Sequence, residues 1–134
     1  MRLVLDASVL TEVLIASPIG TRLQPDLYSY EGALHLPHLA DVETMSVLSR
    51  LARRQVLTED RARQATQELR VFPARRWPAD ALMLRIWDLR KNLTPYDANY
   101  VALAEVLDAE FWTRDARLYR AISEHSRCRG RLIG

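Results

Sequence analysis

The amino-acid sequence predicts an α/β domain, in which a mostly parallel central sheet of about five strands is flanked by helices on both faces. Two observations lead to this prediction. Short apolar runs alternate along the chain with longer segments of helical periodicity. The chain has 134 residues and contains no internal repeat, low-complexity stretch or interdomain linker, so residues 1–134 are predicted to form one domain.

The first elements are a strand, a helix and a loop region. Arg2–Asp6 is an apolar run that ends in an acid, which predicts the first strand. Ser8 is then expected to be the N-cap of a helix whose apolar side chains recur on one stripe. The two prolines and two glycines within Ser17–Ala33 predict a short helix between loops. Leu34–Pro37 is the second predicted strand.

Two helices and a strand are expected in the middle of the chain. Helical periodicity over Leu39–Arg54 predicts a helix that turns four side chains inward: Val42, Met45, Leu48 and Ala52. Thr58 is the expected N-cap of the next helix, because two acidic residues follow it in the positive first turn. Val71–Phe72 predicts a third strand, which Pro73 closes.

Ala79–Lys91 is predicted to be a helix that is apolar almost all round, so no single face of it can bury all of these side chains against one sheet. Either a neighbouring helix covers it, or it contacts another chain. We expect a homodimer through this helix, with Trp77 and Trp87 as anchors of the contact.

The last part of the chain predicts two helices and two strands. A helix is expected over Thr94–Leu107, with Thr as N-cap and Pro at the first helical position. Glu110–Thr113 is the next strand. Asp115 then caps a helix that ends at Glu124, and Arg131–Ile133 is the expected last edge strand.

The composition excludes several classes of protein. With 49% hydrophobic residues, 27% charged residues and a net charge of +2, the chain is typical of a globular domain and not of a disordered one. Cys128 is the only cysteine, and the three histidines form no zinc-binding pattern. Asp6 and Glu12 interrupt the apolar opening segment, which is too short and too charged to span a membrane. We therefore expect a cytoplasmic protein without a membrane partner.

Arginine dominates the basic residues, since 18 of the 19 are Arg and only Lys91 is Lys. Eight arginines lie between Arg50 and Arg76, and six more between Arg114 and Arg131. Taken singly, each arginine is expected to lie on a solvent-exposed face of a helix. As a set they leave a nucleic-acid partner open, because the guanidinium group can bind two phosphate oxygens at once.

Four carboxylates map to one rim of the predicted sheet, where the carboxyl ends of parallel strands form sites. Asp6 ends the first strand, and Asp115 follows the Glu110–Thr113 strand. Glu43 and Asp97 lie in the early turns of two helices, each at the end of a stripe that otherwise holds core residues. Converging carboxylates raise the affinity for a cation, and an all-oxygen ligand set favours Mg²⁺ or Mn²⁺.

Each of these acids also has a purely structural interpretation. Asp97 can complete a capping box with Thr94, and Asp115 can be a plain N-cap. Asp6 can close a loop and Glu43 can pair with an arginine. Two hydroxyl residues near the rim, Ser8 and Thr113, either hydrogen-bond a carboxylate or metal-bound water, or only cap a helix and end a strand.

Four blocks of the sequence resemble the PIN-domain family, and their order and spacing agree over nearly the whole chain. The blocks are Val4–Val9, Pro37 with Glu43 and Ser46–Arg50, Tyr96–Ala104, and Phe111–Leu118. The size of the chain is similar to that of the stand-alone branch of the family, the VapC-type toxins of toxin–antitoxin pairs.

The resemblance implies a PIN-like ribonuclease domain that depends on Mg²⁺ or Mn²⁺, cleaves RNA, forms dimers and is silenced by a cognate antitoxin. It also implies that Asp6, Glu43, Asp97 and Asp115 are the catalytic acids. Asp6 and Asp97 would be the primary metal ligands, and Asp115 would assist directly or through water.

Two alternatives remain within this resemblance: an RNA-processing nuclease that is not a toxin, and a catalytically silent RNA-binding domain. The hypothesis of a silent domain predicts that one of the four catalytic acids has been lost, whereas all four are present. Two features depart from the family pattern. Trp112 lies where the family more often has a smaller aliphatic residue, and Ser17–Ala33, with Tyr28 and Tyr30, matches no block well. They concern the substrate groove and the partner surface, not the four acids.

Overall fold

The computed structural model describes all 134 residues and contains one five-stranded sheet, in which every pair of neighbouring strands is parallel. The strand order is β3-β2-β1-β4-β5. The strands are β1 (Leu3–Leu5), β2 (Leu34–Pro37), β3 (Arg75–Trp77), β4 (Glu110–Thr113) and β5 (Arg129–Leu132). The predicted α/β class is therefore confirmed, and the sheet is parallel throughout rather than mostly so.

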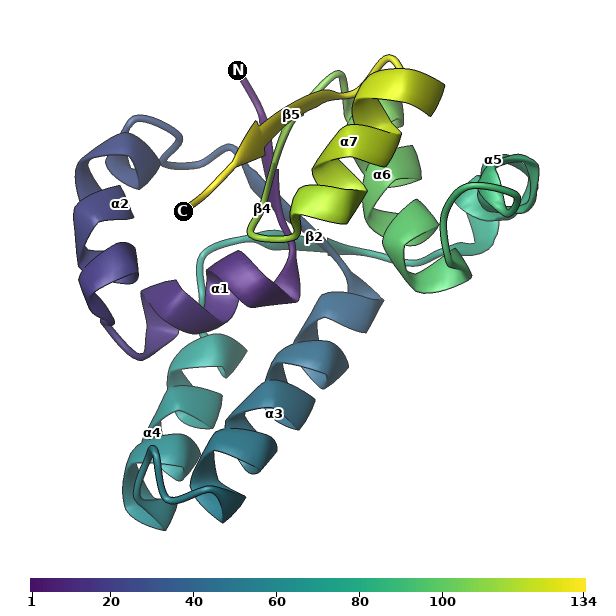
Figure 1. The fold of residues 1–134 in the computed structure, drawn as a ribbon. Helices are drawn as coiled ribbons and strands as arrows, with labels where there is room; N and C mark the ends of the chain where they lie inside the picture. Colours follow the sequence, from purple (N-terminus) through teal and green to yellow (C-terminus); the bar gives the residue numbers. More distant parts are fainter.

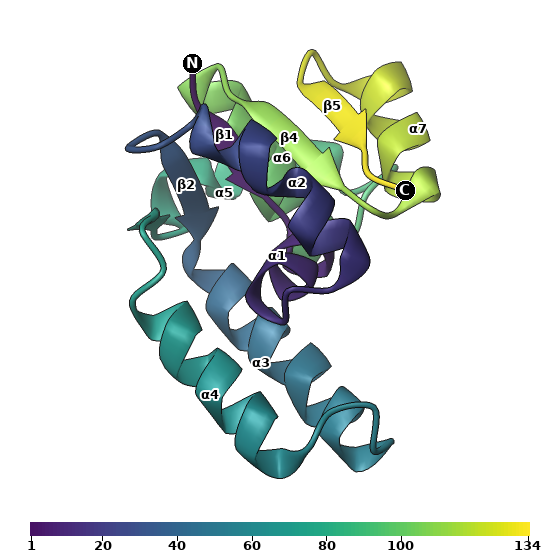
Figure 2. The same cartoon turned by 90° about the vertical axis from the view of Figure 1, so that its left-hand side faces the viewer.

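Seven α-helices connect the strands and surround the sheet (Figure 1). They are α1 (Ala7–Leu14), α2 (Pro18–Tyr28), α3 (His38–Arg53), α4 (Glu59–Arg70), α5 (Met83–Leu89), α6 (Pro95–Leu107) and α7 (Ala116–His125). The α3–α4 pair projects away from the sheet as a helical hairpin (Figure 2). No helix combines the length and the apolar content that a membrane span requires.

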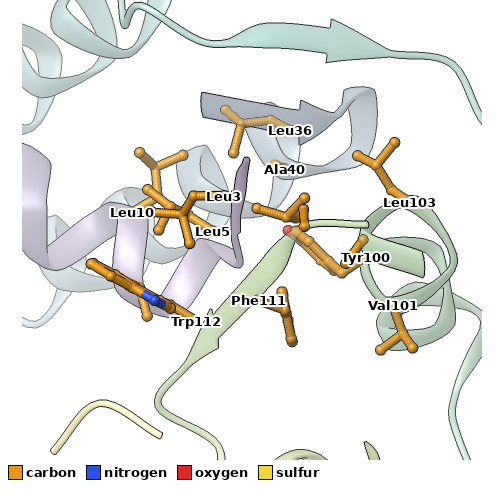
Figure 3. Packing of buried hydrophobic residues seen from close by; sticks show 14 of the residues in the cluster. Leu3, Leu5, Leu10, Leu36, Ala40, Tyr100, Val101, Leu103, Phe111 and Trp112 are labelled. Carbon is orange, nitrogen blue, oxygen red and sulfur yellow. The ribbon is translucent and has the colours of Figure 1, made fainter. Parts of the chain in front are cut away.

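The core lies on both faces of the central strands β1 and β4. Neighbouring residues of β4 point to opposite faces, as the pleat requires. Phe111 packs against Tyr100 of α6, whereas Trp112 meets Tyr30 edge-on from the other face. Figure 3 shows Leu10 of α1 on the Trp112 side and Val101 of α6 on the Phe111 side. Helices thus cover both faces, and the buried strands fix the positions of the loops at their carboxyl ends.

Two predictions for the first third of the chain need correction. Asp6, not Ser8, is the N-cap of α1, because its carboxylate accepts a hydrogen bond from the Val9 N–H. The Ser17–Ala33 segment contains more helix than expected, since α2 has 11 residues with Ser17 as its N-cap. Gly20 lets α2 approach α1 closely, because a Cβ there would lie 2.0 Å from the Glu12 carbonyl oxygen.

The prediction that Val71–Phe72 forms the third strand is wrong. Val71 ends α4 as its C-cap, and the strand is the polar segment Arg75–Trp77. Arg76 is anchored there by the Asp41 carboxylate and by the backbone carbonyls of Leu69, Phe72 and Ala74. β3 is at the edge of the sheet and is only partly buried, so its residues can be polar. A search for apolar runs therefore did not identify it.

Three further predictions need adjustment. In α3 the buried residues are Ala40, Thr44 and Leu48, whereas Val42 and Met45 are exposed. Smaller side chains face inward because α1 and α4 both pack against this helix. The predicted Ala79–Lys91 helix is a 3₁₀ turn followed by the shorter α5, and the last strand begins two residues earlier than expected.

Candidate functional site

The four predicted acids line one cavity of about 310 Å³ at the carboxyl ends of the strands. Asp6 follows β1, and Glu43 lies in the second turn of α3, which begins directly after β2. Asp97 lies in the first turn of α6, and Asp115 follows β4 as the N-cap of α7. Ser8 lines the same cavity. The topology thus brings together side chains that are up to 109 residues apart (115 minus 6).

Asp6 is the most buried of the four acids, with 7% of its surface exposed. Its Oδ1 accepts hydrogen bonds from the Ser8 hydroxyl at 2.5 Å and from the Val9 N–H at 3.1 Å. Its Oδ2 accepts one from the Thr113 hydroxyl at 2.5 Å. Burial nevertheless raises the pKa of Asp6 above its ordinary value. These bonds hold the carboxylate in one orientation at the floor of the cavity.

The two hydroxyl residues also connect the neighbouring loops. The Thr113 hydroxyl accepts a hydrogen bond from the Asp115 N–H, and the Ser8 hydroxyl accepts one from the Arg114 N–H. Asp6 is therefore linked through Ser8 and Thr113 to the backbone at the start of α7. Both residues hydrogen-bond a carboxylate, which is one of the two roles that their positions predict.

Asp97 is half-buried, and its surroundings disfavour the charged form of its carboxyl group. Burial is the largest cause that raises the pKa of Asp97, followed by the negative charge of Asp115 and then those of Glu43 and Asp6. Thr94 caps α6 through a hydrogen bond from the Asp97 N–H, but the reciprocal bond of a capping box, from the Thr94 N–H to the Asp97 carboxylate, is not formed. The Asp97 carboxylate therefore does not complete a capping box, although a side-chain hydrogen bond with Thr94 acts to lower its pKa.

Asp115 combines both of its predicted roles. Its Oδ1 accepts hydrogen bonds from the Arg117 and Leu118 N–H groups, as an N-cap does. Its Oδ2 accepts none, and the side chain lines the cavity beside Asp97. A helix cap thus leaves one carboxylate oxygen available to a ligand.

Glu43 is held by a residue that the sequence did not single out. The hydroxyl of Tyr100 donates a hydrogen bond of 2.6 Å to Glu43 Oε1. Tyr100 is 2% exposed, and burial followed by this contact with Glu43 raises the pKa of its phenol well above the ordinary value, so the phenol remains a donor. One feature of the sequence could have identified Tyr100. It is a single tyrosine, three residues after Asp97, in a helix face otherwise made of small and aliphatic residues.

No basic side chain neutralises these four acids. None of them forms a salt bridge, whereas Asp41, the nearest acidic neighbour of Glu43 in the sequence, pairs with Arg76 at 3.1 Å. Arg50 is the one basic residue among the 11 that line the cavity, and its side chain contacts no carboxylate. The four carboxylates therefore share the cavity without an ion pair to any of them.

The ligand chemistry of this cavity suits a hard divalent cation. No three acidic, histidine or cysteine side chains are already arranged around a single metal position. However, Mg²⁺ keeps several of its waters and commonly binds through one or two carboxylates together with substrate phosphates. The side chains of the lining that can bind a metal ion are carboxylates and hydroxyls, with no histidine or cysteine among them, which fits Mg²⁺ or Mn²⁺.

Comparisons with known sequences give a consistent result. The chain matches the PIN domain family over residues 3–123. It is 48% identical over 85 residues to VapC ribonuclease Mb0985 of Mycobacterium bovis, which covers 63% of this chain and 67% of that protein. It is 34% identical over 125 residues to ribonuclease VapC3 of Mycobacterium tuberculosis, which covers 90% of this chain and 87% of that protein.

Two solved structures share the fold. PAE2754 from Pyrobaculum aerophilum is 20% identical with a TM-score of 0.68, over 97% of this chain and 83% of that one. VapBC2 from Rickettsia felis, bound to a DNA fragment from its promoter, is 10% identical with a TM-score of 0.71, over the full length of both chains. Since the family match spans nearly the whole sequence and includes all four cavity acids, this chain belongs to the PIN domain family.

Proposed function

We propose that this protein is a metal-dependent endoribonuclease that hydrolyses phosphodiester bonds in RNA, and that it is the toxin of a toxin–antitoxin pair. The observation that carries the proposal is the cavity in which Asp6, Glu43, Asp97 and Asp115 meet without a salt bridge to any of them. The relatives named VapC ribonucleases support the reaction and the substrate class.

In this proposal Asp6, Asp97 and Asp115 hold Mg²⁺, or Mn²⁺ in its place, with Asp115 acting directly or through water. When bound, such a cation lowers the pKa of a water and offsets negative charge on the phosphoryl oxygens. The hydrogen bonds from Ser8 and Thr113 keep the Asp6 carboxylate aimed into the cavity.

The remaining groups orient the substrate and the attacking water. Tyr100 fixes Glu43 through Oε1, which leaves Oε2 to accept a hydrogen bond from that water. The N-termini of α1, α6 and α7 lie at the same rim and add positive potential near the phosphate. Ser8 is not assigned as a nucleophile, because no histidine lines the cavity to act as its base.

A cognate antitoxin and a cytoplasmic location, where the RNA substrate is found, belong to the same proposal. The family resemblance supports the antitoxin, and so does the fold shared with VapBC2. A small gene encoding the antitoxin directly upstream of the gene for this chain would support the toxin role over RNA processing.

A homodimer is supported by α5. Its side chains Met83, Leu84 and Trp87 are 60%, 84% and 63% exposed, so no neighbouring helix of the same chain covers them. An exposed apolar surface of this kind is typical of an interface. Light scattering at tens of micromolar should report a dimer that Leu84→Glu converts to a monomer; a monomeric parent protein would contradict the proposal.

The enzymatic proposal is tested by incubating the purified protein with total RNA and Mg²⁺ and sequencing the new RNA ends. We expect defined cleavage sites that disappear in excess EDTA and return when Mg²⁺ is restored. Undiminished cleavage in EDTA would reject metal dependence, and RNA left intact with Mg²⁺ or Mn²⁺ would favour a silent RNA-binding domain.

A further inference from the structure

Two arginines without an acidic partner flank the four-acid cavity. Arg50 lines this cavity from the fourth turn of α3. Arg117 lines an adjoining cavity of about 310 Å³, which shares Asp97 and Asp115 with the first. Both arginines are exposed, and neither side chain forms a hydrogen bond or salt bridge. Their guanidinium groups are therefore free to bind a ligand.

Several other arginines are used differently. Arg76, Arg85 and Arg129 each contact a carboxylate within 3.2 Å, and Arg114 pairs with Glu12. These arginines stabilise contacts between elements of the chain. Arg50 and Arg117 form no such contact, although both lie beside a cavity rich in acids.

The position of Arg117 does not favour the stability of α7. It is the second residue of this helix, where the backbone N–H groups and the helix dipole favour an anion and disfavour a cation. The first turn of α7 contains no acidic residue besides the N-cap Asp115. A cation at this place is better explained by a ligand than by helix stability.

Phosphate is the ligand that this arrangement suits. Four carboxylates repel an RNA backbone, so a substrate needs cations on the approach to the reacting phosphate. The fork of an arginine binds phosphate oxygens in pairs. Figure 1 shows α3 extending downward from the rim and α7 lying above it, and the two arginines belong to these two helices.

Building on the ribonuclease function proposed above, we propose that Arg50 and Arg117 bind backbone phosphates on the two sides of the scissile phosphate. A single RNA strand then crosses the four-acid cavity from α3 to α7. Each arginine contributes affinity for the backbone and positions the strand, and neither takes part in the hydrolysis itself.

The test measures binding of a fluorescein-labelled oligouridine of about 12 nucleotides by anisotropy at several salt concentrations. All proteins in the binding series carry Asp97→Asn, so that the RNA is not cut. Arg50→Gln and Arg117→Gln should each weaken binding and lower the slope of log K against log salt by about 0.7, the value for one phosphate contact on a single strand. Arg50→Lys and Arg117→Lys should restore most of the slope.

The matched controls are Arg53→Gln on α3 and Arg120→Gln on α7, because both arginines are exposed, unpaired and outside the two cavities. They should leave the slope unchanged. With Asp97 intact, the two test variants should raise KM for RNA while kcat is retained.

The outcomes separate this inference from the proposed function. If the test variants and the controls change the slope equally, the arginines act only through net charge and the inference is wrong. Unchanged binding in the test variants, with cleavage by the parent protein intact, also rejects the inference but leaves the ribonuclease standing. A parent protein that neither binds nor cleaves RNA rejects both.

Discussion

The pKa values of two carboxyl groups, one near each end of helix α6, are shifted in opposite directions. Asp97, in the first turn, lies where the helix dipole should lower the pKa, yet burial and then the charge of Asp115 raise it. Glu105, near the other end, lies where the dipole should raise the pKa. Burial does act in that direction, but hydrogen bonds from Arg85 and Ser126 outweigh it and lower the pKa.

The difference shows that neighbouring groups, not the helix, determine the direction in which the pKa of each acid shifts. The Glu105 side chain is 3% exposed and receives two hydrogen bonds from Arg85, at 2.7 and 3.0 Å, and one from Ser126 at 2.5 Å. Asp97 shares its cavity with three other acids and forms no salt bridge. The fold pairs the acid that joins α5, α6 and the segment after α7, and leaves the cavity acids without a salt bridge.

The largest expected effect is that of Asp97→Asn on RNA cleavage. The variant removes a proposed metal ligand, and we expect the rate to fall by at least about a hundredfold. Thermal melting in EDTA should show an unchanged or raised melting temperature, since one member of a repelling group of carboxylates is lost. Near-normal cleavage with a lowered melting temperature would instead make Asp97 a helix cap.

Asp6→Asn provides the matched comparison within the cavity. Its effect on cleavage should equal that of Asp97→Asn, but its melting temperature in EDTA should fall. Asp6 accepts three hydrogen bonds and caps α1, and the amide of asparagine cannot accept from both Ser8 and Thr113 on separate oxygens. Equal stability of the two variants would show that these bonds contribute little.

At the other end of α6, Glu105→Gln should lower stability without lowering activity. The variant leaves Arg85 without its carboxylate partner, and we expect a loss of about 2 kcal/mol in the free energy of unfolding, measured with urea. RNA cleavage should stay within twofold or so of the parent rate, about 0.4 kcal/mol, because Glu105 does not line the cavity. The control is Glu124→Gln on α7, where the side chain is exposed. A large loss of activity at unchanged stability would contradict the contrast between the two ends.

Tyr100→Phe tests the contact that positions Glu43. The ring stays packed on Phe111 while the hydrogen bond to Glu43 is lost, so we expect kcat/KM to fall about tenfold. The loss of stability should not exceed about 1 kcal/mol. Tyr96→Phe, at an exposed position on the same helix, should change neither quantity. Cleavage by Tyr100→Phe at the parent rate would remove Tyr100 from the positioning of Glu43.

The smallest effect is the pH dependence of the metal-free protein. Because the folded pKa of Asp97 is raised, its favourable contribution to stability is present below the unfolded pKa and is lost as pH rises through the folded pKa. Asp6 contributes with the same sign. For Glu105 the folded pKa is lowered, so its contribution is present above the unfolded pKa and is lost as pH falls through the folded pKa.

The measurement for this last effect is urea unfolding in EDTA between about pH 4 and pH 7. Asp97→Asn should lose less stability than the parent as pH rises, and Glu105→Gln should lose less than the parent as pH falls. If Asp97→Asn has the same pH profile as the parent, the raised pKa of Asp97 is excluded.

Elements with strong local signals were predicted well from the sequence. Leu34–Pro37 and Glu110–Thr113 are strands with the predicted bounds, and the Thr94 cap and Pro95 predicted the start of α6. These signals come from residues that are neighbours in the sequence. Combined with the prediction of a parallel sheet, they also placed the four acids at one rim. The edge strand Arg75–Trp77 was missed because only its pairing with β2 makes it a strand.

The parts of the site that sequence did not predict depend on contacts between distant elements. Tyr100 is 57 residues from Glu43, and nothing local indicates that its hydroxyl meets that carboxylate. The inward face of α3 was misjudged for a similar reason, since packing against two helices selects Ala40 and Thr44 over larger side chains. The spacing of apolar residues predicts that a helix has a buried face. Tertiary packing determines which of two adjacent rows of side chains is buried.

The central claim is that the acids of the cavity bind a divalent cation, and calorimetric titration of Mn²⁺ into the metal-free protein tests it most directly. We expect saturable binding by the parent and by Asp41→Asn, whose carboxylate pairs with Arg76 outside the cavity. Binding should be lost or strongly weakened in Asp97→Asn. Equal Mn²⁺ binding by the parent and Asp97→Asn, or no binding by the parent, would contradict the account.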